Sequence, residues 1–91
     1  MKSTAILKQN PAMITRTIDG QAVIMDPLEG KLLTLNEVGT FIWEMADGNF
    51  TQEDMLTSLC REFEVSREAA SSDLDEFTAT LREKSLLLLE E

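Results

Sequence analysis

The sequence predicts a small α+β domain in which a three-stranded antiparallel sheet precedes three helices. Asp19-Gly20 separates two stretches rich in Ile, Val, Thr and Met, which is a strong signal for a β-hairpin. After Asn36, apolar residues recur at helical spacing. A chain of 91 residues is long enough for one domain with a modest core. The order β-β-β-α-α-α is typical of a winged-helix-like arrangement with the sheet placed first.

The first two expected strands are Met13–Ile18 and Gln21–Asp26. A two-residue turn at Asp19-Gly20 fixes their register, because a type I′ turn needs positive φ at both central residues. The register places four apolar residues on one face, which we expect to be the core face. These residues are Ile14, Ile18, Val23 and Met25.

The turn Pro27-Leu28-Glu29-Gly30 introduces the third expected strand, Lys31–Leu35. Leu33 and Leu35 share one face of this strand, and Leu32 lies on the other face with Thr34. Because only one face can meet the core, one leucine points away from it. We expect a loop and a helix to cover that leucine.

The chain ends are expected to differ. Residues 1–10 are mixed and polar and are followed by Pro11, which predicts an N-terminal arm that is loose or only partly docked. Residues 11–91 are expected to form a single domain, in which Leu86–Leu89 packs back on the core after a helix that Ser85 ends.

Three helices are predicted from caps and apolar stripes. Asn36, Thr51 and Ser66 are suited to be N-caps, with Asp54 completing a capping box at Thr51. Gly48 is suited to end the first helix in a left-handed conformation. The three stripes are Val38, Phe41, Ile42 and Met45, then Met55, Leu56, Leu59, Cys60 and Phe63, then Ala70, Leu74, Phe77 and Leu81.

Two residues in these helices have alternative interpretations. Trp43 lies off its stripe, so it either packs against another element or marks a contact surface, and packing is favoured. Cys60 is the only cysteine and lies on its stripe without a partner, which favours a small core residue over a nucleophile.

Charge excludes several classes of function. The net charge is −9, and it divides into +1 for residues 1–36 and −10 for residues 37–91. Such an acidic helical half repels phosphate, which argues against binding of nucleic acid or of an anionic membrane surface. No apolar run has the length of a signal peptide or a membrane span, so we expect a cytoplasmic protein.

The residues for catalysis are also missing. The chain has no His, no Gly-rich phosphate loop and no cysteine cluster. Its acidic groups at 53–54, 73–76 and 90–91 lack the loop pattern of a calcium site and are expected to be solvated. We therefore predict a protein that is not an enzyme and has no catalytic residue, cofactor or metal. The remaining feature is the edge of strand 31–35, to which an extended peptide can add as a further strand.

A set of short motifs spans about residues 10–89: Asn10-Pro11, Arg16, Asp19-Gly20, Val23-Ile24-Met25, Gly30, Leu33-Thr34-Leu35-Asn36, Ile42-Trp43, Asp47-Gly48, Thr51 and Leu81 to Leu87. In this order and at these spacings, the motifs resemble the PqqD-like family of small peptide-binding domains, which are also called RiPP recognition elements. The most specific part of the resemblance is Leu-Asn, an Ile-Trp helix and Asp-Gly-x-x-Thr.

This resemblance implies a peptide chaperone for a ribosomally made precursor. The leader segment of the precursor would add to the third strand, lie beside the third helix and be presented to a modifying enzyme, often a radical SAM enzyme. The product would be pyrroloquinoline quinone or another modified peptide, and the chaperone would be a monomer or a homodimer.

The resemblance also implies a peptide-binding site. On this chain it comprises Lys31, Leu32, Leu33, Thr34, Leu35, Ala69, Asp73, Glu76, Phe77, Thr80 and Lys84. The opposite flank of helix 67–84 is an alternative, with Ser71, Asp75, Thr78 and Arg82. The acidic helices are suited to steer a basic segment of the leader or a basic patch on the enzyme.

A second class of function stays open at this stage. The expected topology also permits an acidic winged-helix module that contacts other proteins in transcriptional regulation. Direct reading of DNA is disfavoured, because the expected third helix begins with four acidic residues against one Arg within residues 67–76.

Overall fold

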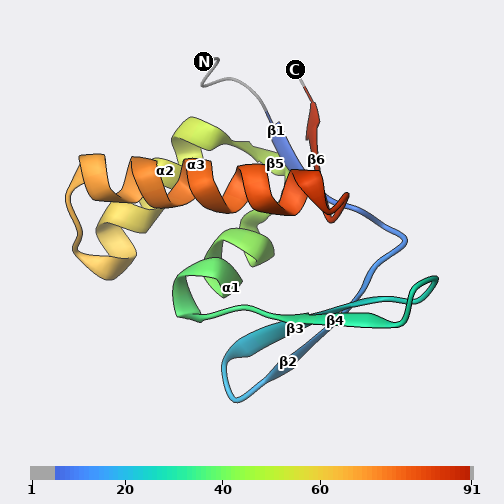
Figure 1. The fold of residues 1–91 in the computed structure, drawn as a ribbon. Coiled ribbons are helices and arrows are strands. Elements are labelled where there is room, and N and C mark those ends of the chain that lie inside the picture. Colours follow the sequence, from blue (N-terminus) through green and yellow to red (C-terminus); the bar gives the residue numbers. More distant parts are fainter. Residues whose placement is uncertain (1–5, 91) are drawn as a thin grey trace.

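The computed structural model of the protein describes residues 6–90. This part of the chain is an α+β fold with three helices and two three-stranded antiparallel sheets (Figure 1). The strands are β1 (Ile6–Gln9), β2 (Ile14–Ile18), β3 (Gln21–Asp26), β4 (Lys31–Thr34), β5 (Asp47–Thr51) and β6 (Leu87–Glu90). The helices are α1 (Glu37–Met45), α2 (Gln52–Phe63) and α3 (Arg67–Glu83).

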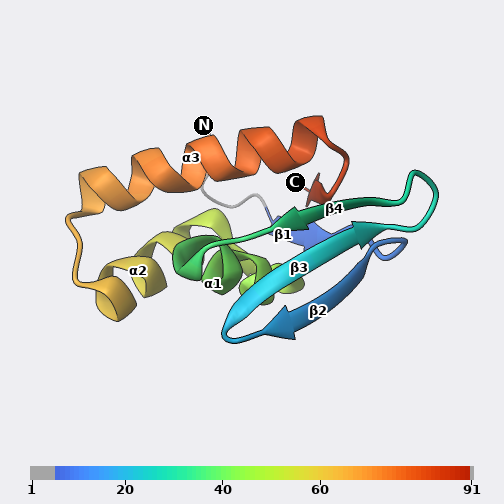
Figure 2. The same cartoon turned by 60° about the horizontal axis from the view of Figure 1, so that its bottom comes forward.

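The first sheet has the order β2-β3-β4 and confirms the predicted hairpin (Figure 2). Ile18 pairs with Gln21 across the Asp19-Gly20 turn, and both turn residues have positive φ. Strand β4 follows on the other side of β3, with Leu33 paired to Ile24. The register of β2 against β3 was therefore predictable from the Asp19-Gly20 turn alone.

The predicted core face of this sheet is wrong. Ile14 and Ile18 are 48% and 54% exposed, whereas Ala22 and Ile24 are fully buried. Trp43 of α1 lies under the inner face, where its indole N–H donates to the hydroxyl of Thr15 at 3.0 Å. The turn fixes which residues pair but not which face is buried. The buried face is the one that meets α1, where the N–H of Ala22 donates to the Thr40 hydroxyl at 2.9 Å.

One leucine of β4 faces away from the core, as expected. It is Leu32, which pairs with Met25 on the outer face and is 66% exposed. The expectation that a loop and a helix cover it is wrong. The outer face of the first sheet therefore carries an apolar row of Ile14, Met25 and Leu32, one from each strand.

The second sheet contradicts the predicted order of elements. Its order is β5-β1-β6, so the strand Ile6–Gln9 lies between two partners (Figure 1). We expected residues 1–10 to form an arm that is loose or only partly docked, but in the described residues 6–9 Leu7 is fully buried and pairs with Leu89. Ile6–Gln9 is too short for an alternating apolar pattern to reveal a strand. The other residues of the expected arm, 1–5, lie outside the described part.

The end of α1 also differs from the expectation. The helix ends at Met45 with Ala46 as its C-cap, and the chain then enters β5. Gly48 has φ of +90°, yet it lies within β5 beside the side chain of Lys8 and not at a helix end. The prediction of a positive φ at Gly48 is confirmed, but the prediction that Gly48 ends a helix is wrong.

The remaining helical predictions are confirmed. Asn36 accepts from the N–H of Gly39 at 2.8 Å, and Thr51 with Asp54 forms a capping box. Ser66 caps α3. Trp43 is 1% exposed, which confirms packing, and the half-buried Cys60 packs against the core.

The buried strand β1 gives a first prediction. Leu7→Ala should lower the free energy of unfolding by about 2–5 kcal/mol, because it leaves a cavity in the core. Urea denaturation followed by circular dichroism measures this change. Lys8→Ala, at the exposed neighbouring position, should stay within about 0.5 kcal/mol of wild type. Equal stability of the two variants would contradict the docking of this strand.

Candidate functional site

The outer edge of β4 is unpaired within residues 6–90, because β4 is the last strand of the sheet β2-β3-β4. Leu35 N–H donates to the carbonyl of Ala22 at 2.8 Å. Backbone groups of an antiparallel strand point alternately to either side. The groups of Lys31 and Leu33 therefore face β3, and those of Leu32 and Thr34 face the open edge.

Helix α3 passes above β4 in Figure 2, and residues from both elements line the same clefts. Two clefts, of about 350 and 370 Å³, lie between them and share Leu33. We call the two clefts together the β4–α3 groove. The first is lined by Leu33, Leu35, Asn36, Val38, Ile42, Asp73, Glu76, Phe77, Thr80 and Leu81. The second is lined by Ile24, Asp26, Glu29, Lys31, Leu32, Leu33, Glu83, Lys84, Ser85 and Leu86.

The first cleft has an apolar floor. Leu35, Ile42 and Leu81 are buried in the core, and Phe77 is packed against it while partly exposed. Phe77 is held close to α1, where a Cβ placed on Gly39 would lie 2.9 Å from its ring carbon Cε1. Glycine at position 39 thus allows the ring to approach the helix. This floor is suited to take an apolar side chain from a bound chain.

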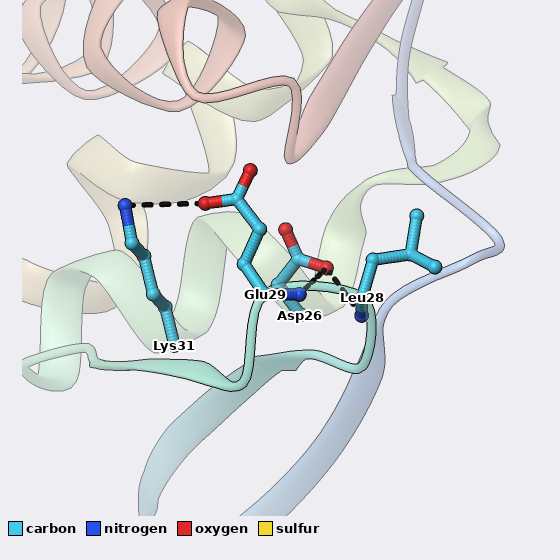
Figure 3. Close-up of polar contacts among 4 residues, drawn as sticks. All are labelled: Asp26, Leu28, Glu29 and Lys31. Carbon is cyan, nitrogen blue, oxygen red and sulfur yellow. Dashed lines mark hydrogen bonds and ion pairs between the residues drawn. The ribbon is translucent and has the colours of Figure 1, made fainter.

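The second cleft is bounded by the turn between β3 and β4, which is drawn in Figure 3. The Asp26 carboxylate accepts from the N–H groups of Leu28 and Glu29, at 2.9 and 3.3 Å. Lys31 Nζ lies 3.1 Å from a Glu29 carboxylate oxygen. The two bonds to Asp26 stabilise the turn. Glu29 and Lys31 line the second cleft, whereas Leu28 does not line it and is 91% exposed.

The structure brings together nine of the eleven expected site residues. Lys31, Leu32, Leu33, Leu35, Asp73, Glu76, Phe77, Thr80 and Lys84 line the groove. The other two, Thr34 and Ala69, line neither cleft, although Thr34 lies within β4. Their role in binding a peptide stays a prediction.

The alternative flank of α3 faces away from the β4–α3 groove. Ser71 and Asp75 line a separate open hollow beside α2, and Thr78 is buried. Arg82 lines neither cleft of the groove.

Sequence reasoning missed part of the groove wall. Asn36 and Val38 directly follow the strand, so their nearness to its end was a usable signal. Glu29 lies two residues before the strand and carried the same signal, whereas Asp26 and Leu86 come from other segments.

Within residues 6–90, no three His, Cys, Asp or Glu side chains are grouped so as to hold a metal ion. No helix of the same part is long and apolar enough to cross a membrane. The groove supplies main-chain groups, apolar surface and charges, which are the components of a peptide-binding site.

Solved structures with this fold include proteins bound to leader peptides. TbiB1 in complex with the TbiA(beta) leader peptide is 29% identical, with a TM-score of 0.81, covering 88% of this chain and 93% of that one. Lasso peptide synthetase B1 complexed with the leader peptide is 24% identical, with a TM-score of 0.77, covering 90% of this chain and 96% of that one. These neighbours place the fold among small domains that have been solved with leader peptides.

The chain belongs to the PqqD family. Residues 21–87 match the family of coenzyme PQQ synthesis protein D (PqqD), which confirms the resemblance drawn from the sequence. The heterocyclase TruD shares the fold at 21% identity and a TM-score of 0.66, covering 93% of this chain but 11% of that chain. No curated protein matches. None of these comparisons supports the alternative of a transcriptional module.

The contact between Gly39 and Phe77 gives a second prediction. Gly39→Ala should displace the Phe77 ring, because the added methyl group occupies its place. The helix propensity gained, about 1 kcal/mol, offsets part of the repacking cost of about 1–3 kcal/mol. The aromatic NMR shifts of Phe77 report the displacement. Glu44→Ala on the same helix is the control, and unchanged Phe77 shifts in Gly39→Ala would contradict the contact.

Proposed function

We propose that this protein is a non-catalytic adaptor that binds the leader segment of a ribosomally synthesised precursor peptide. The leader adds as a strand to the open edge of β4, lies in the β4–α3 groove and is presented to a modifying enzyme. The observation that carries this proposal is the edge of β4, which no strand within residues 6–90 pairs with and which lies beside the apolar floor of the groove.

The family and the fold support the same role. The relative at 29% identity was solved with a leader peptide, and it covers nearly the same length as this chain. The family match runs from β3 through α3 into β6, so it includes both walls of the groove.

Binding by strand addition suits a disordered leader. The outward N–H and C=O groups of Leu32 and Thr34 bond the incoming main chain, while the clefts select side chains. Ordering the leader costs conformational entropy, so the affinity should be moderate even with a well-formed ladder. Such an affinity allows the adaptor to release the peptide after modification.

The partner enzyme is the second part of the proposal. The family resemblance favours a radical SAM enzyme and the synthesis of pyrroloquinoline quinone or another modified peptide. The same fold forms a small part of the much longer heterocyclase TruD, which supports a role beside a modifying enzyme. In this role the adaptor contributes recognition and the enzyme contributes the chemistry.

The decisive experiment is an NMR titration with the leader peptide of a precursor gene that neighbours this one. Shifts should concentrate in residues 31–35 and in the flank of α3 that lines the groove, including Asp73, Glu76 and Thr80. Binding that leaves residues 31–35 unshifted would refute strand addition.

A proline at the open edge gives a third prediction. Thr34→Pro removes an outward N–H and should weaken leader binding about tenfold, since a hydrogen bond is worth about 0.5–1.5 kcal/mol and the edge is also distorted. Isothermal titration calorimetry measures the affinity.

The matched control is Thr17→Pro. Because Ile18 and Gln21 flank the two-residue turn as a bonded pair, the N–H of Thr17 also points outward, at the opposite edge of the sheet. This control should bind the leader as wild type does. Unchanged affinity of a folded Thr34→Pro variant would argue against the proposed edge.

A further inference from the structure

We infer that the first cleft of the groove selects a leader segment with a Lys or Arg two residues from an apolar anchor. This inference rests on the proposed function and names the peptide chemistry that the site accepts. The anchor fills the apolar floor beside Phe77, and the basic side chain meets the carboxylates of Asp73 and Glu76 at the rim.

The ionisable side chains at the rim of the first cleft are all acidic. Among the ten residues that line the first cleft, Asp73 and Glu76 are the ionisable ones. Among the described side chains, the ion pairs are Lys31 with Glu29 and Arg67 with Glu53, so neither rim carboxylate has a cationic partner. Residues three apart lie on the same helix face, where like charges repel each other. A cation bound between them relieves this repulsion.

The other end of the groove is different. The second cleft combines Asp26, Glu29 and Glu83 with Lys31 and Lys84, so its charges largely compensate. The groove therefore has one acidic end, beside Leu35, and one mixed end, beside the β3–β4 turn. A basic residue of the leader is preferred at the first end.

Strand geometry sets the spacing between the anchor and the base. Successive side chains of an added strand point to opposite faces, so residues two apart lie on the same side, about 7 Å from each other. An anchor that reaches the floor therefore has its groove-side neighbours at positions plus or minus two. A base at plus or minus one points to the outer face of the sheet, away from Asp73 and Glu76.

The test uses synthetic nonapeptides with a central Phe and with Lys, Gln or Glu placed either one or two residues from it. Binding to the full chain is measured by fluorescence polarisation. Wild type should prefer Lys to Glu by about tenfold at plus or minus two, given two exposed ion pairs. It should show little preference at plus or minus one. The better of the two same-side positions reports the direction of the bound strand.

Two variants locate the effect. Asp73→Lys with Glu76→Lys should reverse the preference at plus or minus two. Glu68→Lys with Asp75→Lys makes the same charge change on the flank that lines the other hollow, and it should keep the wild-type preference. An equal response of both variants would assign the effect to net charge and overturn the inference.

The remaining outcomes separate the inference from the proposed function. Peptides that bind and shift residues 31–35, but show no charge preference, overturn the inference and leave strand addition intact. Failure of every peptide to bind, while the genuine leader also fails, overturns the proposed function and the inference together.

Discussion

The single ladder that joins β4 to β3 is the constraint on which the candidate site depends. The pairing of Leu33 with Ile24 and the bond from Leu35 N–H to the Ala22 carbonyl hold β4 on one side. The same ladder turns Leu33 and Leu35 towards the core, where they form part of the groove floor. Within residues 6–90, it leaves the alternate main-chain groups, those of Leu32 and Thr34, without partners. One set of contacts therefore anchors the strand, builds the floor and exposes the edge.

The second wall of the site depends on helix caps, which set where the helices begin, and on the packing of α3 against the core. Asn36 ends the strand segment and begins α1 within two residues of the ladder, so the start of α1 closes one end of the first cleft. Ser66 and the left-handed Ser85 define where α3 begins and where the chain turns back after it. Ala70, Leu74 and Leu81 hold α3 against the core, and this packing positions the flank with Asp73 and Glu76 relative to β4.

Local chemistry made much of this fold predictable. The Asp-Gly turn gave the pairing of β2 with β3, and the caps and stripes gave three helices. The buried face of the first sheet and the order of the strands were harder to predict, because they depend on contacts between distant segments. Val23 and Met25 are as apolar as Ala22 and Ile24, so alternation alone could not choose the inner face. The strand Ile6–Gln9 is recognisable only through its partners in β5 and β6. For α3, periodicity identified the core stripe, whereas the choice of groove flank required the position of β4.

The apolar row on the outer face of the first sheet affects how copies of the protein interact with each other. Ile14, Met25 and Leu32 lie on the face opposite to the buried one, and Arg16 is the charged residue on that face. Such a face favours contact between copies. The net charge of −9, concentrated in the helical half, creates a long-range repulsion that opposes this contact. The acidic helices therefore oppose association through this apolar sheet face, and acid or concentrated salt weakens the repulsion.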